Sequence, residues 1–201
     1  MAIINKYMLA SELDLIKRCQ SGDLEAFGDI YEMYVNKIYD FIYFRTSHKE
    51  TAEDLTSLVF MKALEKIKDF NIELGYFSAW IYKIARNSII DHYRTKKVHA
   101  NIDDHQEIKD SSDIEYEIEI KCSIEKVKKY IKKLNKEQRD ILIMRIWDGL
   151  SYDEISKIIG KSEANCKVIV SRSLALIRKE SILVFFILIT NQIMSNFIKH
   201  N

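Results

Sequence analysis

Apolar side chains recur every three or four residues along the first half of the chain, which is the pattern of amphipathic helices. The pattern begins near Ser11 and is broken once, at Gly22 and Asp23, so it predicts two consecutive helices up to about Ile42. It then predicts a third helix over 49–67 and a fourth over 76–97, with a loop between them.

Helical periodicity fades after Lys97 and returns near Ile124. The stretch between them is dominated by Asp, Glu and Ser, and it buries too little apolar surface to offset the entropy of ordering it. We therefore expect a linker there. Beyond it the spacing predicts four more helices, over 124–134, 141–147, 152–159 and 162–179.

The chain is thus predicted to be all-α, with two small helical domains joined by an acidic linker. Its 201 residues include no proline and five glycines, and 47% are hydrophobic, which is enough for a core in each domain. The expected parts are a first domain over 1–97, the linker over 98–120, a second domain over 121–180 and an apolar C-terminal extension over 181–201.

Charge is distributed unevenly along the chain. The net charge of +1 is the sum of unequal parts: a neutral first domain, a linker of −7 and a second domain of +7. The second domain contains fifteen basic and eight acidic side chains. Asymmetry of this kind indicates a polyanionic partner for residues 121–180, whereas the total charge alone indicates none.

The second domain contains the sequence pattern of a helix-turn-helix. A short helix from Tyr152 is followed by Gly160 at the turn, by Ser162 as a helix cap, and by the small residue Cys166 in the next helix. With Cys166 buried, an outward face remains, and its basic residues would meet a DNA major groove. The alternative from spacing alone is an ordinary helical hairpin with solvated cations. The positive charge of this domain favours DNA. The outward face holds Ala164, Lys167, Val168, Ser171, Arg172, Ala175 and Arg178.

The fourth predicted helix combines aromatic and cationic side chains. On a helical projection, one face is apolar and the opposite face carries cations and an amide. Aromatic rings interleaved with cations suit single-stranded nucleic acid, because bases stack on rings while cations follow the backbone. Taken alone, this helix is better explained by Trp80 and Tyr82 in a core and by cations on a solvated surface. The polar face holds Lys83, Arg86, Asn87, Ile90 and Arg94.

The order of these motifs is similar to that of the extracytoplasmic-function (ECF) group of sigma-seventy-family RNA polymerase sigma factors. The resemblance covers roughly residues 10–180. It implies two helical domains, sigma-two and sigma-four, that bind core RNA polymerase and direct it to promoter DNA. It lies in Asp23-Leu-Glu-Ala-Phe-Gly-Asp-Ile-Tyr31, Ala52-Glu-Asp-Leu-Thr56, Val59-Phe-Met-Lys-Ala-Leu64, Phe77-Ser-Ala-Trp-Ile-Tyr-Lys-Ile-Ala-Arg-Asn87, Leu134-Asn-Lys-Glu-Gln-Arg-Asp140 and Gly149-Leu-Ser-Tyr-Asp-Glu-Ile155.

The resemblance also implies roles for individual residues. Docking on the coiled coil of the largest polymerase subunit falls to Asp54, Leu55, Val59 and Phe60. Capture of a flipped base and of the non-template strand at the minus-ten element falls to Asn71, Phe77, Trp80, Lys83, Arg86, Asn87 and Arg94. Recognition of the minus-thirty-five element falls to Asn165, Lys167, Ser171 and Arg172.

Two positions depart from the family pattern. Ser57 and Leu58 stand where the family usually has a polar and then an acidic residue, so the polymerase-facing surface is expected to be less acidic. Val168 and Ile169 stand where the reading helix usually has Ser and then Arg. Loss of that Arg removes a base or phosphate donor, and a bidentate contact contributes about 1–3 kcal/mol of discrimination.

Other features bound the function. Three separated cysteines and the lack of a secretory signal favour a cytoplasmic protein. We find no catalytic motif and no metal-ligand spacing, so we expect no enzymatic activity and no cofactor. An anti-sigma factor is a further candidate partner. The apolar tail is expected to pack on the protein or a partner, in preference to membrane contact through 182–198.

Two other functions remain open from the sequence. The first is a helix-turn-helix regulator that binds duplex DNA without polymerase, which leaves the aromatic and cationic fourth helix unexplained. The second is a degenerate, membrane-associated sigma-like interaction protein, which Val168 and Ile169 keep open.

Overall fold

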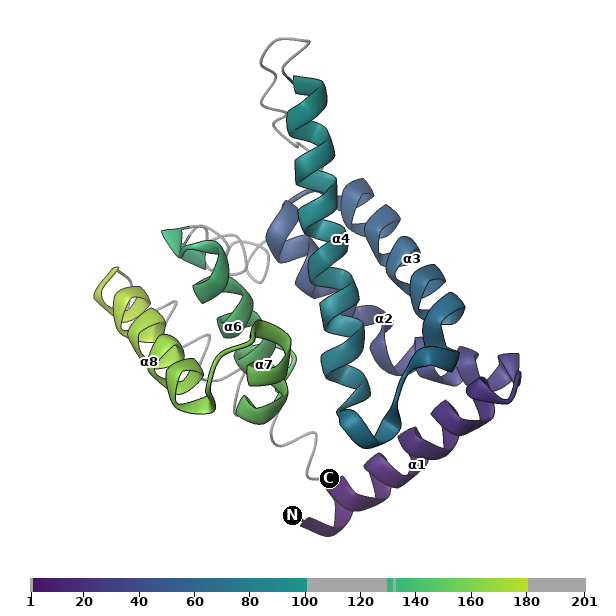
Figure 1. The fold of residues 1–201 in the computed structure, drawn as a ribbon. Helices are drawn as coiled ribbons and strands as arrows, with labels where there is room; N and C mark the ends of the chain where they lie inside the picture. Colours follow the sequence, from purple (N-terminus) through teal and green to yellow (C-terminus); the bar gives the residue numbers. More distant parts are fainter. Residues whose placement is uncertain (1, 101–129, 132, 181–201) are drawn as a thin grey trace, which may run out of the picture. The chain divides into compact units, whose positions relative to one another are not determined.

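A computed structural model describes residues 2–100, 130–131 and 133–180. The chain divides into two compact units, 1–109 and 110–201, and each is described by itself. Throughout the described residues the regular structure is helical, which confirms the all-α prediction (Figure 1). Most of the predicted linker and the whole apolar extension lie outside the described residues.

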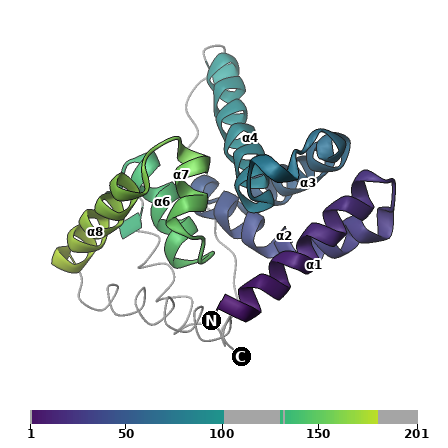
Figure 2. The same ribbon diagram turned by 60° about the horizontal axis from the view of Figure 1, so that its bottom comes forward.

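Within residues 2–100, the first unit contains four α-helices. Helix α1 packs on α2, α2 packs on both α3 and α4, and α3 packs on α4 (Figures 1 and 2). The helix α1 begins well before the predicted start at Ser11, and α4 continues past the predicted end at Lys97. The elements are α1 (Ala2–Gln20), α2 (Leu24–Thr46), α3 (Lys49–Lys66), the 3₁₀ turns η1 (Ile67–Asp69) and η2 (Ile72–Leu74), and α4 (Phe77–Ala100).

Local signals set the ends of these helices. Asp23 caps α2, because its carboxylate accepts hydrogen bonds from the backbone N–H groups of Glu25 (3.0 Å) and Ala26 (3.2 Å). Ser47 ends α2 in the left-handed conformation, with φ of 53°. The next residue, His48, caps α3 through Nδ1, which accepts from the N–H of Thr51 at 3.2 Å. Short connections therefore hold consecutive helices side by side.

The core of the first unit follows the predicted apolar spacing. Helix α2 contributes Ile30, Ile38 and Phe41, which are inaccessible to solvent, and α4 contributes Ile81 and Tyr82. The rings of Phe41 and Tyr82 meet edge to face, with centroids 5.3 Å apart. The packing of α4 against this core leaves its opposite side available to solvent.

The second unit contains α6 (Lys136–Ile146), α7 (Tyr152–Ile159) and α8 (Glu163–Glu180). Both α6 and α7 begin with a capping box, Asn135 with Gln138 and Ser151 with Glu154, in which each side chain bonds the other residue's backbone N–H. Because Asn135 caps α6, that helix begins earlier than its apolar run at 141–147.

The turn between α7 and α8 has the predicted helix-turn-helix form. Gly160 ends α7 at φ of 77°, where a side chain would be strained. Ser162 then caps α8, and its Oγ accepts from the N–H of Asn165 at 3.3 Å. Cys166, Val170, Ser173 and Ile177 are buried as predicted. Burial raises the pKa of the Cys166 thiol, so this residue is a neutral core side chain.

Candidate polymerase and nucleic-acid interfaces

Three of the four residues expected to contact polymerase lie inside the first unit. Leu55 and Phe60 are almost fully buried and Val59 is inaccessible to solvent, because all three face α2 and α4 from the inner side of α3. Asp54 alone is exposed. Leu55, Val59 and Phe60 therefore hold α3 in place. Only the outer side of α3 is open to contact with another protein.

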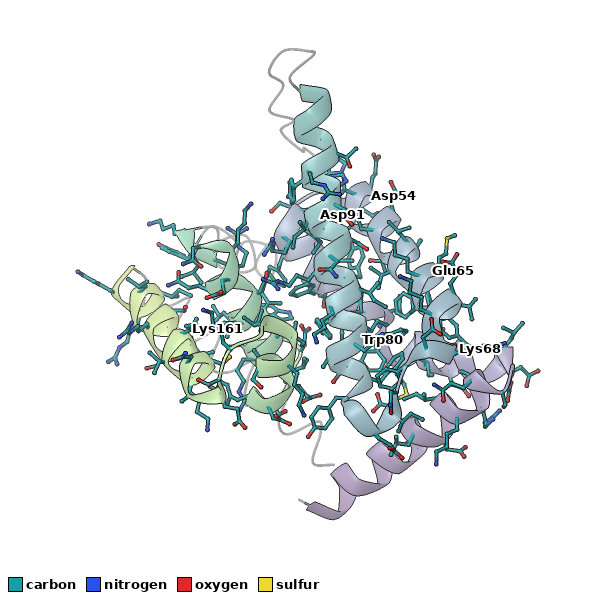
Figure 3. All side chains as sticks on the ribbon, viewed as in Figure 1. Asp54, Glu65, Lys68, Trp80, Asp91 and Lys161 are labelled. Atoms are coloured by element: carbon teal, nitrogen blue, oxygen red, sulfur yellow. The ribbon has the colours of Figure 1, made fainter. Side chains whose placement is uncertain are left out.

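The outer side of α3 carries an exposed apolar stripe, and of its members only Leu58 was expected on the polymerase-facing surface. Leu58 is 38% exposed, Met61 61% and Leu64 41%. Asp54 lies near the start of this helix and Glu65 near its end, and both are exposed (Figure 3). We call Asp54, Leu58, Met61, Leu64 and Glu65 the α3 outer face. The signal in the sequence was an apolar spacing of three, parallel to the buried stripe.

The loop between α3 and α4 is fixed to the rest of the first unit. The Gln20 side chain at the end of α1 donates to the carbonyl oxygens of Ile67 (2.9 Å) and Phe70 (2.6 Å). Asn71 is exposed, and its Oδ1 accepts from the N–H of Glu73 at 2.9 Å, which caps η2. A loop held in this way offers a preformed surface, because its backbone is already ordered.

An aromatic cluster connects this loop to the start of α4. The ring centroids of Phe70, Phe77 and Trp80 are 5.3–5.6 Å apart in each pair, and Phe77 also lies 5.4 Å from Tyr34. Phe77 and Phe70 are buried, whereas Trp80, labelled in Figure 3, is half-buried. Of the predicted aromatic contacts with DNA, Trp80 is therefore the ring that solvent can reach, and Phe77 supports it from below.

The polar side of α4 lies at the surface, as its helical spacing predicts. Lys83, Asn87 and Arg94 are exposed and Arg86 is half-buried, while Phe77, Ile81, Ala85 and Ser88 on the other side are buried. Arg94 forms an ion pair with Asp91 at 3.4 Å. We call Lys83, Arg86, Asn87, Ile90 and Arg94 the α4 polar face.

A hydrogen bond across the helix pair fixes α4 on α3. Lys62 Nζ donates to Ser88 Oγ at 3.1 Å, and Ser88 is 1% exposed. This bond lies behind the α4 polar face, so the face has a rigid support.

The second unit exposes the predicted reading surface on α8. Asn165, Lys167, Ser171 and Arg172 are all exposed, and so are the other residues assigned to the outward face. The N-terminal half of α8 therefore presents polar and basic side chains in the arrangement of a recognition helix. We call Ala164, Lys167, Val168, Ser171, Arg172 and Ala175 the α8 reading face.

Lys167 is positioned by two contacts. Its Nζ lies 3.8 Å from a carboxylate oxygen of Glu163 and 5.5 Å from the ring centroid of Tyr152 at the start of α7. The guanidinium of Arg145 lies 4.6 Å from the same ring centroid and donates to the carbonyl of Leu150 at 2.8 Å. Tyr152 thus connects α6, α7 and α8 at one end of the reading face, a role that the sequence did not indicate.

The described part of the chain shows neither a metal-ligand cluster nor a membrane-spanning helix. Within residues 2–100 and 130–180, no group of three or more His, Cys, Asp or Glu side chains converges as metal ligands would. No helix in those same stretches combines the length and the apolar character that crossing a bilayer requires.

Comparison with known proteins agrees with this geometry. The family model of Sigma-70 region 2 matches residues 30–98, and that of Sigma-70, region 4 matches residues 124–177. The two matches fall in the first and second units respectively.

Similar proteins and solved structures are named as sigma factors too. The chain is 30% identical over 179 residues to the ECF RNA polymerase sigma factor SigW of Bacillus subtilis. This match covers 82% of this chain and 94% of SigW. The chain is 32% identical over 168 residues to the ECF RNA polymerase sigma factor BldN of Streptomyces coelicolor, and it spans 63% of that protein's length and 82% of its own. A solved complex of the sigma factor RpoE with the anti-sigma factor NepR, from Bartonella quintana, has the same fold. Its TM-score is 0.65 at 22% identity, over 76% of this chain and 94% of that one. The chain belongs to the ECF group of the sigma-70 family of RNA polymerase sigma factors.

Proposed function

We propose that this sigma factor binds core RNA polymerase, directs it to promoters and helps to separate the DNA strands there. The observation that carries the proposal is that each unit matching a sigma-70 region presents a polar or basic helix face to solvent, on α4 in one and on α8 in the other. In this proposal the chain contributes binding energy and no chemical step of its own.

Polymerase docks on the α3 outer face. Exposed apolar side chains flanked by acidic ones match the composition of a protein contact, with Leu58, Met61 and Leu64 at its centre and Asp54 and Glu65 at its ends. Val59 and Phe60 act indirectly, because their packing fixes the orientation of α3. This assignment keeps Asp54 as a contact and replaces the buried residues with their exposed neighbours.

The first unit holds the melted minus-ten element. The backbone of the non-template strand runs along α4 and contacts the cations Lys83, Arg86 and Arg94. The Asn87 amide offers a further hydrogen bond to this strand. The half-buried ring of Trp80 stacks on a base that has left the duplex, beside the loop that Gln20 fixes.

Strand separation follows from this binding. Extruding a base costs a few kcal/mol, whereas stacking on an aromatic side chain contributes about 1–3 kcal/mol per base. Contacts between cations and phosphates add to the binding energy. A site of this kind therefore captures bases that open transiently, and it needs no nucleotide hydrolysis.

The second unit contacts the minus-thirty-five element as duplex DNA. Lys167 and Arg172 approach phosphates or base edges in the major groove, and the polar side chains of Asn165 and Ser171 lie on the same exposed part of α8. The contacts of Lys167 with Glu163 and Tyr152 hold its side chain near the surface where the DNA backbone would pass.

Regulation and placement are the remaining parts of the proposal. An anti-sigma factor is a fitting partner, because the RpoE structure similar to this chain is a complex with one. We place the protein in the cytoplasm, where polymerase acts. We keep 98–120 as a linker between the two domains and 181–201 as an extension beyond them.

In vitro transcription tests the function directly. Core RNA polymerase is incubated with and without the full chain on genomic fragments, and both the binding of the chain to core enzyme and run-off transcripts are measured. The proposal predicts binding to core enzyme and new transcripts that depend on the chain.

Two other results would contradict it in different ways. DNA binding without any binding to core enzyme would indicate a regulator that acts alone. Binding to core enzyme with no chain-dependent transcript would indicate a sigma-like subunit that has lost promoter recognition.

A further inference from the structure

The α8 reading face contains one apolar side chain that reaches well into solvent. Val168 is 45% exposed, and it lies in the second turn of α8 between the cations Lys167 and Arg172. Its neighbours along the same side, Ala164 and Ser171, are small. Val168 is therefore the one protruding side chain of the α8 reading face that offers neither a hydrogen bond nor a charge.

Val168 lies outside the buried side of α8. The buried side of α8 is formed by Cys166, Val170 and Ser173, and the half-buried Ile169 lies at its edge. Valine does not stabilise the helix at this position either, because β-branched residues have lower helix propensity than Ala, Lys or Arg. The side chain is thus available to a ligand of the reading face.

The chemistry of the major groove offers one apolar partner. Phosphates and most base edges present hydrogen-bond acceptors or donors, which valine cannot pair with. The C5-methyl group of thymine is the exception, and apolar side chains recognise it by contact. Residues in the N-terminal half of a recognition helix are the ones that reach base edges.

We propose that Val168 reads a thymine methyl group in the minus-thirty-five element and so determines part of the promoter specificity of this sigma factor. The inference rests on the proposed function, because it requires the α8 reading face to lie in the major groove. Lys167, Ser171 and Arg172 make the polar contacts around it, and the small side chains of Ala164 and Ala175 allow α8 to approach the bases closely.

Replacing thymine with deoxyuridine removes the methyl group alone and leaves every hydrogen-bonding group in place. The test begins with holoenzyme made from core polymerase and the full chain, which selects binding sequences from promoter DNA with a randomised upstream element. Each thymine of the selected element is then replaced singly by deoxyuridine, and the affinity of holoenzyme for each probe is measured.

We expect one thymine at which the replacement weakens binding about fourfold, since burying one methyl-sized group contributes about that factor. In Val168→Ala holoenzyme the same replacement should have much less effect, because the contacting methyl groups of the protein are gone. Leu176→Ala is the matched control, since Leu176 is an equally exposed apolar residue two turns further along α8, and this variant should respond like the wild type. Alanine favours helix at both positions, so both variants should fold.

The possible failures are distinguishable. If holoenzyme selects no upstream sequence at all, the proposed function of α8 fails and the inference fails with it. If it selects a sequence but no thymine responds to deoxyuridine, or if the response is the same in Val168→Ala, the role of Val168 is wrong while the function of the α8 reading face stands.

Discussion

Truncating Met61 to alanine tests which side of α3 meets polymerase. Met61 is the most exposed apolar member of the α3 outer face, at 61%. Full burial of a methionine side chain contributes about 1.5–3 kcal/mol, so covering the exposed part leaves about 1–2 kcal/mol for binding. Met61→Ala should therefore raise the dissociation constant for core polymerase about five- to thirtyfold.

The stability of the free protein should hardly change, because the side chain lies at the surface. Its free energy of unfolding should stay within about 0.5 kcal/mol of the wild-type value. Val59→Ala offers the opposite case, since Val59 is fully buried. Removing its two methyl groups costs about 0.8 kcal/mol each in transfer free energy plus a cavity term, or about 2 kcal/mol in all.

The assay is equilibrium binding of full-length, fluorescently labelled chain to core polymerase, together with chemical unfolding of the same samples. Leu176→Ala serves as the control, because it removes an exposed apolar side chain from the other unit. If Met61→Ala binds core polymerase as tightly as the wild type, docking through the α3 outer face is refuted.

Three further predictions concern other parts of the chain. Gly160→Ala should destabilise the second unit by about 1 kcal/mol because the backbone there has φ of 77°, and Gly160→Asn should cost less, as thermal unfolding would reveal. Trp80→Ala should reduce permanganate reactivity of promoter thymines in the open complex, whereas Trp80→Phe should retain most of it, and equal loss in both would argue against stacking. The pKa of Asp23 lies below its usual value of 3.8, chiefly because Arg18 donates a hydrogen bond to it, so the stability from this carboxylate is present above that value and is lost as pH falls through the folded pKa. Asp23→Asn keeps a helix cap without the charge, so its free energy of unfolding should fall less below about pH 4 than that of the wild type, and equal falls would contradict this assignment.

The α8 reading face could be predicted from the sequence almost completely. Gly160 and Ser162 fix where the helix begins, and Cys166 at its start sets which side is buried. With Cys166 fixing the buried side, the 3.6-residue period then determines which residues face outward. The structure places each of them at the surface.

The buried side of α3 could also be predicted from its apolar spacing, because Ala52, Leu55, Val59 and Ala63 share one side and all are buried. The side that meets polymerase could not be predicted in the same way. Similarity to the family assigned Leu55, Val59 and Phe60 to the polymerase contact, although packing against α2 and α4 buries them.

Contacts between distant residues were also beyond the sequence. Gln20 bonds carbonyl groups 47 and 50 residues further along, and Tyr152 meets Lys167 across the helix-turn-helix. Neither pair has a local signature, because helix packing brings the partners together. The sequence therefore showed the loop between α3 and α4, which Gln20 holds, only as a break between helices.

Sequencing the 5′ ends of transcripts made in vitro from genomic DNA tests whether this chain directs polymerase to promoters. Core polymerase alone is compared with core polymerase plus the full chain. We expect a limited set of start sites that appear only with the chain and that share two upstream sequence elements at a fixed spacing. The same start sites with and without the chain would contradict it.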